Sequence, residues 1–262
     1  TTLDFLRSAA YLGGVDFFHR WAGNAYVVAG AVAGGYVTGS PLAITLAQRA
    51  SSRYYQRPDA GHLALDTTRT SLAGVTADVT VRRLAGDWLG GVAFSTTTPG
   101  FEVNDAGFQT RVDRISVAAD LLRRWTTPGK VFRRGNVGAF WGPSLNWDGD
   151  VIQQLVGLNA FAQLLNYWGF NAFGNLRFDA VDDRLTRGGP ITKEPGGWEA
   201  GGGFFTDDRK RVAGDVFLFG NRDKAGAWFW RINAQLSVRP SAAVSVVSRS
   251  IRIRLPVSRF SA

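Results

Sequence analysis

Arginine, aspartate, asparagine and tyrosine side chains recur in three long segments between otherwise regular stretches of the chain. A guanidinium beside a carboxylate can form an ion pair, or it can bind a ligand when the pair is incomplete. A connection as long as residues 39–69 is unusual for a passive loop, so we expect it to fold inward as a plug or constriction. The alternative is that internal salt bridges order the loops. The candidate loop and plug residues are Arg53, Tyr54, Arg57, Asp59, Asn104, Asp105, Asp183, Arg184 and Arg187.

Asp59, His62 and Asp66 are the residues that best suit a metal ion, because carboxylate and imidazole groups bind zinc and other divalent cations. A single histidine between two aspartates is more typical of a hydrogen-bonded loop. Acidic turns such as Asp148-Gly149-Asp150 lack the spacing of a calcium loop. We therefore predict no bound metal or other cofactor.

A catalytic set is not evident in the sequence. The chain has no Cys and two His, and no Gly-x-Ser-x-Gly motif is present. The glycine-rich segments, residues 186–190 and 201–203, do not match a phosphate-binding or dinucleotide-binding pattern. A binding, transport or structural function is favoured over an enzymatic one. A surface enzyme that acts through the long loops stays open as an alternative.

Hydrophobic and polar residues alternate over long stretches, as in residues 71–82 and 228–239. A period of two is typical of a strand with one apolar and one polar face. The stretches exceed the usual 5–6 residues of a soluble strand and suit the roughly 9–11 residues of a tilted membrane strand. We predict about twelve strands, near 10–22, 25–38, 70–83, 87–98, 112–125, 131–147, 151–165, 167–181, 197–207, 211–222, 227–239 and 242–255.

Connections between these segments alternate between short turns and longer loops. Short ones are expected near Gly23-Asn24, Asn166 and Pro240-Ser241, whereas the long ones span about 39–69, 99–111 and 182–196. Outer-membrane barrels have short periplasmic turns and longer outer loops, with aromatic residues at both interfaces. Tryptophans near the strand ends fit such belts. The best helical candidate is residues 41–53, inside the first long loop.

The predicted fold is therefore all-β: an antiparallel transmembrane β-barrel with its long loops on one end. Residues 1–262 form a single β-barrel domain. With short turns in the periplasm, the first and last strands would both have their free ends outside. Bacterial barrels have even strand numbers, so we expect the domain to be part of a larger barrel, incomplete at both ends.

Some arginines lie on the strands themselves. Arg82, Arg114, Arg177 and Arg231 occupy polar positions of the alternation, which would face the lumen because a lipid-facing Arg at mid-bilayer costs about 2–4 kcal/mol. An arginine-lined lumen would favour anions. Pairing with aspartates of the same face would cancel that field, and this alternative stays open.

Three loop segments, occurring in the same order along the chain, resemble segments of a known family. They are residues 52–60, Ser-Arg-Tyr-Tyr-Gln-Arg-Pro-Asp-Ala; residues 99–108, Pro-Gly-Phe-Glu-Val-Asn-Asp-Ala-Gly-Phe; and residues 182–190, Asp-Asp-Arg-Leu-Thr-Arg-Gly-Gly-Pro. The chain resembles bacterial outer-membrane proteins in which a family-nine-type carbohydrate-binding domain precedes a β-barrel domain of unknown function. The resemblance implies location and architecture. It implies no catalytic residues.

The net charge and the expected location limit the classes of partner that this protein could bind. The net charge is +9, but the arginines are dispersed and no nucleic-acid-binding motif is present, so we predict no nucleic acid. The expected location is the bacterial outer membrane. The expected partners are membrane lipid and lipopolysaccharide, with glycans or other envelope proteins as further candidates. The predicted function is a channel or scaffold, and the alternative is a soluble carbohydrate-binding module.

Overall fold

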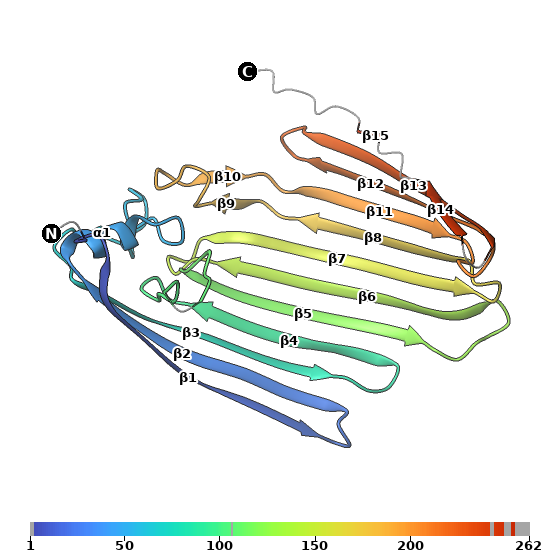
Figure 1. Cartoon of the computed structure of the whole chain (residues 1–262), viewed down its shortest axis with the longest axis horizontal. Coiled ribbons are helices and arrows are strands. Elements are labelled where there is room, and N and C mark those ends of the chain that lie inside the picture. The colour runs from blue at the N-terminus through green and yellow to red at the C-terminus, as the bar shows by residue number, and fades with distance from the viewer. Residues whose placement is uncertain (1–2, 106, 242–243, 249–252, 255–262) are drawn as a thin grey trace.

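The chain forms one curved antiparallel sheet with a helix and several loops at one end (Figure 1). The computed structural model describes residues 3–105, 107–241, 244–248 and 253–254. The sheet has 13 strands, in the order β1-β2-β3-β4-β5-β6-β7-β8-β11-β12-β13-β14, and β15 also pairs with β13. The long strands are arranged in the sheet in the same order as in the sequence. Most neighbouring strands are therefore consecutive in the chain and are joined by one short connection.

Long strands dominate the sheet and closely follow the alternation in the sequence. The strands β1–β8 and β11–β13 contain 9 to 15 residues each. Their bounds are β1 Arg7–Trp21, β2 Tyr26–Gly39, β3 Ser71–Arg83, β4 Trp88–Thr97, β5 Arg114–Trp125, β6 Phe132–Leu145, β7 Val151–Leu164, β8 Gly169–Arg177, β11 Gly197–Phe205, β12 Val212–Asp223 and β13 Trp228–Ser241. The shorter elements are α1 Pro41–Arg49, β9 Ala180–Asp182, β10 Thr192–Glu194, β14 Val244–Ser248 and β15 Ile253–Arg254.

The register sorts the side chains onto two different faces. Arg82 of β3 lies opposite Gly91 of β4, which in turn lies opposite Asp120 of β5. Because alternate residues of a strand point to opposite sides, the same row continues on one face to the far strands. In β6 to β13 the row consists of Phe140, Gly157, Asn175, Glu199, Asn221 and Phe229. We call this the polar face, and the other side, which carries Val81, Leu121 and Leu158, the apolar face.

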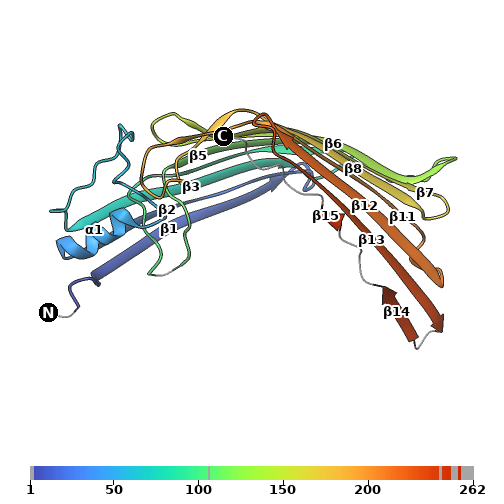
Figure 2. The same ribbon diagram turned by 90° about the horizontal axis from the view of Figure 1, so that it is seen from above.

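The sheet is curved like an arch, with β1 on one side and β13 on the other (Figure 2). The green loop between β4 and β5 hangs on the concave side. That loop packs against the polar face, as shown below, so the polar face is concave and the apolar face convex.

The all-β antiparallel prediction is confirmed. Within the described residues no strand pairing joins β1 to β14 or β15, so closure into a barrel stays a prediction. No helix in the described part of the chain is long and apolar enough to cross a membrane.

The helix α1 begins where the sequence supplies a start signal. Ser40 is the N-cap, its Oγ accepts a hydrogen bond from the Ala43 amide at 3.1 Å, and Pro41 occupies the first turn. The helix ends at Arg49, earlier than predicted, because Ala50 adopts extended backbone angles of φ −55° and ψ 152°. Its apolar side buries a small core against the polar face, formed by Ile44, Ala47, Tyr55, Val37 of β2 and Leu72 of β3.

Two other boundaries also differ from the sequence prediction. The eighth strand leaves the sheet at Arg177, and Ala180–Asp182 pairs instead with Thr192–Glu194 in a separate ribbon. Asp179 accounts for the break, because its carboxylate accepts a hydrogen bond from the Gly196 amide at 2.8 Å. The backbone of Pro240 and Ser241 belongs to β13 and not to the expected turn. Parts of the predicted strand 242–255 lie outside the described residues.

Two glycines open the polar face to the loop that lies on it. A Cβ on Gly35 would come within 2.8 Å of the Glu102 carbonyl oxygen, and one on Gly74 would overlap the backbone of Gly100 and Phe101. Gly35 and Gly74 lie opposite each other in β2 and β3. This pair therefore forms the seat of the β4–β5 loop.

We expect Gly74→Ala to destabilise the protein by about 1–3 kcal/mol, the usual effect of overpacking, because the methyl group must displace the loop. Gly174→Ala in β8 is the matched control, since nothing lies within 4 Å of its ideal Cβ position. The measurement is the denaturant midpoint, combined with protease cleavage within residues 98–113. Equal midpoints and equal cleavage for the two variants would contradict the proposed seat.

Candidate functional site

The long loops converge at one end of the polar face and contact one another. The Val112 amide donates to the Ser52 carbonyl at 3.1 Å, and the Gly61 amide donates to the Asp148 carboxylate at 3.0 Å. Arg184 reaches the Val112 carbonyl at 3.3 Å. We call this assembly the loop cluster; it comprises residues 40–70, 98–105, 107–113, 146–150 and 183–192.

Glu102 is the centre of one buried ion network. Its carboxylate lies 2.6 Å from Arg53 and 2.9 Å from Arg7, and Arg7 also pairs with Asp105 at 2.5 Å. The side chains of Arg53 and Glu102 are almost fully buried. Arg53 also donates to the Phe101 carbonyl. Burial lowers the pKa of Arg53, and the Glu102 charge opposes this shift.

Asp183 is the centre of a second network and is 1% exposed. Arg57 donates to it at 2.9 Å, and Arg111 donates to both of its oxygens at 2.8 and 2.9 Å. The Arg184 Nε lies 3.8 Å away. Burial and the nearby Arg111 charge lower the pKa of Arg184 to about 10. One carboxylate thus holds three guanidinium groups from separate loops.

His62 joins a third set of contacts. Its Nε2 lies 2.7 Å from Asp113, which also accepts a hydrogen bond from the Trp147 amide at 3.0 Å. The His62 Nδ1 lies 3.6 Å from Asp148. These contacts join the first loop to the β4–β5 loop and to the turn between β6 and β7.

The candidate metal ligands do not converge. Asp59 accepts a hydrogen bond from the Ile191 amide, His62 contacts Asp113, and Asp66 binds the Thr68 amide and hydroxyl. No group of three or more His, Asp or Glu side chains in the described residues is placed to hold a metal ion. Each of the three residues therefore stabilises the loops through its own separate contacts.

The other predicted loop residues also lie in the loop cluster. Tyr54 has a positive φ of 56°, and its ring centroid lies 5.5 Å from the Arg184 guanidinium carbon. Asn104 accepts a hydrogen bond from the Gln109 amide at 2.8 Å. Arg187 is exposed and has a φ of 55° in the turn before Gly188. Arg187 therefore shapes the turn through its backbone.

All four strand arginines lie on the polar face. Arg82 makes a bidentate contact with Asp120 at 2.7 and 2.8 Å. Arg114 donates to Ser144 at 2.9 Å, and Arg231 lies over the rings of Phe219 and Phe229. Arg177 lies 3.9 Å from Glu194. The face therefore combines paired arginines with arginines held by neutral groups.

Sequence reasoning missed several residues that order the loop cluster, namely Arg7, Gln48, Glu102, Arg111 and Asp113, and it considered Asp148 only as part of a calcium-type turn. Glu102 lies inside the 99–108 segment of the family resemblance, and Glu is rare in this chain. These two features of the sequence could have identified it as a candidate. Gln48 binds the backbone of Asp66 at 2.7 and 2.9 Å, a contact that no local pattern indicates.

We expect Glu102→Gln to reduce stability by about 3–5 kcal/mol, because it leaves the buried Arg53 charge without its partner. Glu194→Gln is the control. Glu194 is half-exposed and 3.9 Å from Arg177, so it should change stability by under about 1 kcal/mol. Urea unfolding followed by tryptophan fluorescence measures both. Similar shifts for the two variants would show that burial does not strengthen the Glu102 network.

Comparison with known proteins adds the family. The model of the domain of unknown function DUF5916 matches residues 30–253. Neither a curated protein nor a solved structure matches the chain significantly. The match covers the helix, the three long loops and most of the sheet, so the chain belongs to the DUF5916 family of domains of unknown function.

Proposed function

We propose that this chain forms the β-barrel sheet of a bacterial outer-membrane protein, and that the loop cluster closes the outer mouth of the lumen. The protein then acts as a closed channel or as a membrane scaffold. The observation that carries the proposal is the exposed apolar face, which extends from β1 to β13.

Large hydrophobic side chains on this face are exposed along the strands, and in β4, β5, β7 and β12 they lie away from the strand ends. The exposed fraction is 54% for Val92, 53% for Leu121, 60% for Leu158, 56% for Leu176 and 48% for Val216. Apolar patches on soluble monomers rarely exceed a few hundred Å². A soluble carbohydrate-binding module would leave this face in water, whereas a bilayer covers it with hydrocarbon.

Aromatic side chains border the same face at both ends, as expected for interface belts. Trp21, Trp88 and Trp125 mark the end with the short turns, and Tyr36 and Trp198 mark the end with the loops. The guanidinium groups of Arg83 and Arg123 lie 5.9 Å from the Tyr26 ring and 5.5 Å from the Trp88 ring. Basic groups beside aromatics at a strand end suit the headgroup region.

The polar face supports the other half of the proposal. In a barrel this concave face encloses the lumen, where the arginine pairs stay away from hydrocarbon. The loop cluster rests on one end of it through Val37 and Leu72 and through the Gly35–Gly74 seat. Because long loops lie outside in such barrels, this end is extracellular. Lipopolysaccharide, glycans and other envelope proteins are the partners available there.

The membrane location can be tested with neighbouring residues of β7 that face opposite sides. We expect Leu158→Arg to block stable membrane insertion, because a lipid-facing arginine near mid-bilayer costs about 2–4 kcal/mol. Asn159→Arg lies on the polar face and should insert normally. The measurement is the fraction that stays in the membrane pellet after alkaline carbonate extraction. A wild-type protein that is extracted completely would refute the membrane proposal.

The closed mouth can be tested by conductance in a planar lipid bilayer. Asp183→Asn removes the charge that holds Arg57 and Arg111 together, so we expect it to raise the open probability at least about tenfold, which corresponds to about 1.4 kcal/mol. Glu194→Gln should behave as the wild type. If Asp183→Asn leaves the conductance unchanged, the Asp183 network does not hold the mouth closed. If no variant conducts current, the channel function is refuted and the scaffold function is the one supported.

A further inference from the structure

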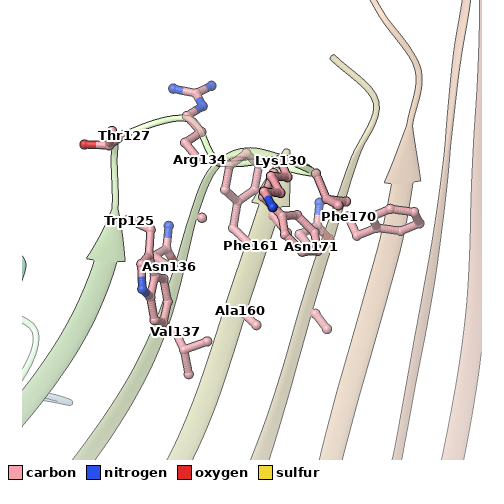
Figure 3. Close-up of a pocket in the computed structure, with 16 residues that line it drawn as sticks. Trp125, Thr127, Lys130, Arg134, Asn136, Val137, Ala160, Phe161, Phe170 and Asn171 are labelled. Carbon is pink, nitrogen blue, oxygen red and sulfur yellow. The ribbon is translucent and has the colours of Figure 1, made fainter. Parts of the chain in front are cut away.

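An apolar groove lies on the apolar face at the end with the short turns (Figure 3), and the loop cluster lies at the opposite end of the strands. Its volume is about 660 Å³. The floor consists of small residues of three adjacent strands: Gly135, Ala160, Ala162 and Ala172. A row of small side chains between large ones leaves a channel.

Large side chains form the walls of this groove. Trp125 and Val137 lie on one side and Phe170 on the other, while Ala160 lies deeper toward the strand middle (Figure 3). A register shift between Phe132 and Arg134 turns Phe132 toward the apolar face, opposite Leu164. Phe132 and the following turn residues close the end of the groove. The lining residues that belong to the apolar face of the strands are all nonpolar, and the two asparagines of the lining, Asn136 and Asn171, belong to the polar face.

Lys130 provides positive charge at the mouth. It is exposed at the turn end of the groove (Figure 3), and the residues that line the groove include no Asp or Glu. By contrast, Lys224 pairs with Asp179 at 2.6 Å. Among the described residues, no carboxylate pairs with Lys130. The groove therefore presents a long apolar channel with the Lys130 ammonium group at its opening, whereas Arg134, which also lines it, donates to the neutral Gln163 carboxamide at 3.0 Å.

The strand arrangement narrows the class of occupant. The groove floor belongs to β6, β7 and β8, and each of these strands is already paired on both sides. A peptide added as a further strand would find no free backbone edge there. Only a ligand that needs no backbone hydrogen bonds fits the floor, and its polar part must lie beside Lys130.

We propose that this groove binds one acyl chain of an anionic phospholipid, and that Lys130 contacts the lipid phosphate. The inference rests on the proposed membrane location. With the loops outside, the short-turn end faces the periplasm, where the inner leaflet supplies phospholipid. Apolar surface buried by the chain provides affinity, and the lysine selects the charged headgroup.

The test is native mass spectrometry of the whole protein in detergent micelles, titrated with phosphatidylglycerol or with phosphatidylcholine of identical chains. We expect the wild type to prefer phosphatidylglycerol. Lys130→Gln should reduce that preference about fivefold, since a basic residue near an anionic headgroup contributes about 1 kcal/mol. Lys210→Gln, at the same end of the sheet, should change nothing.

Filling the groove tests the acyl-chain contact separately. Ala160→Leu should weaken the binding of both lipids, whereas Ala200→Leu on the apolar face of β11 should not. A wild type that binds both lipids equally, or an Ala160→Leu variant that binds as the wild type, would overturn the inference. In that case retention in carbonate-extracted membranes would still support the proposed function, and its loss would refute both.

Discussion

The constraint on which the rest of this structure depends is the register of the long strands. Because side chains alternate with a period of two, a slip of one residue would exchange the polar and apolar faces of a strand. The observed register keeps Arg82, Gly91 and Asp120 in one row across three strands. The Arg82–Asp120 ion pair bridges the glycine between them. It is possible only because Gly91 has no side chain in its path.

The same register prepares the polar face to receive the loops. Gly35 and Gly74 lie opposite each other, so the Phe101 backbone can approach the sheet closely. Burial beneath the loops then removes Glu102 and Arg53 from water. A buried pair is weak evidence for net stability, because desolvation offsets its attraction. The networks around Glu102 and Asp183 are better understood as specifying one loop arrangement. Removing either carboxylate would leave buried guanidinium groups without a charged partner.

Sequence periodicity predicted the strands because each depends on local alternation. It also placed the long loops at one end, since consecutive antiparallel strands must return there. The partners inside the loops were beyond its reach. Arg57 pairs at 2.9 Å with Asp183, which is 126 positions away in the sequence, whereas Asp59, two positions away, lies at 3.7 Å. The β9–β10 ribbon and the shift at Phe132 depend on contacts with other strands, so no local pattern reports them.

Small residues have opposite consequences on the two faces of the sheet. On the polar face the missing side chains are replaced by protein, because the loop backbone fills the space above Gly35 and Gly74. On the apolar face the space above Ala160, Ala162 and Ala172 stays open as a groove. Cores close such voids because unfilled contacts lose dispersion energy. At the membrane location that we propose, acyl chains of the bilayer would fill the open groove and supply those contacts.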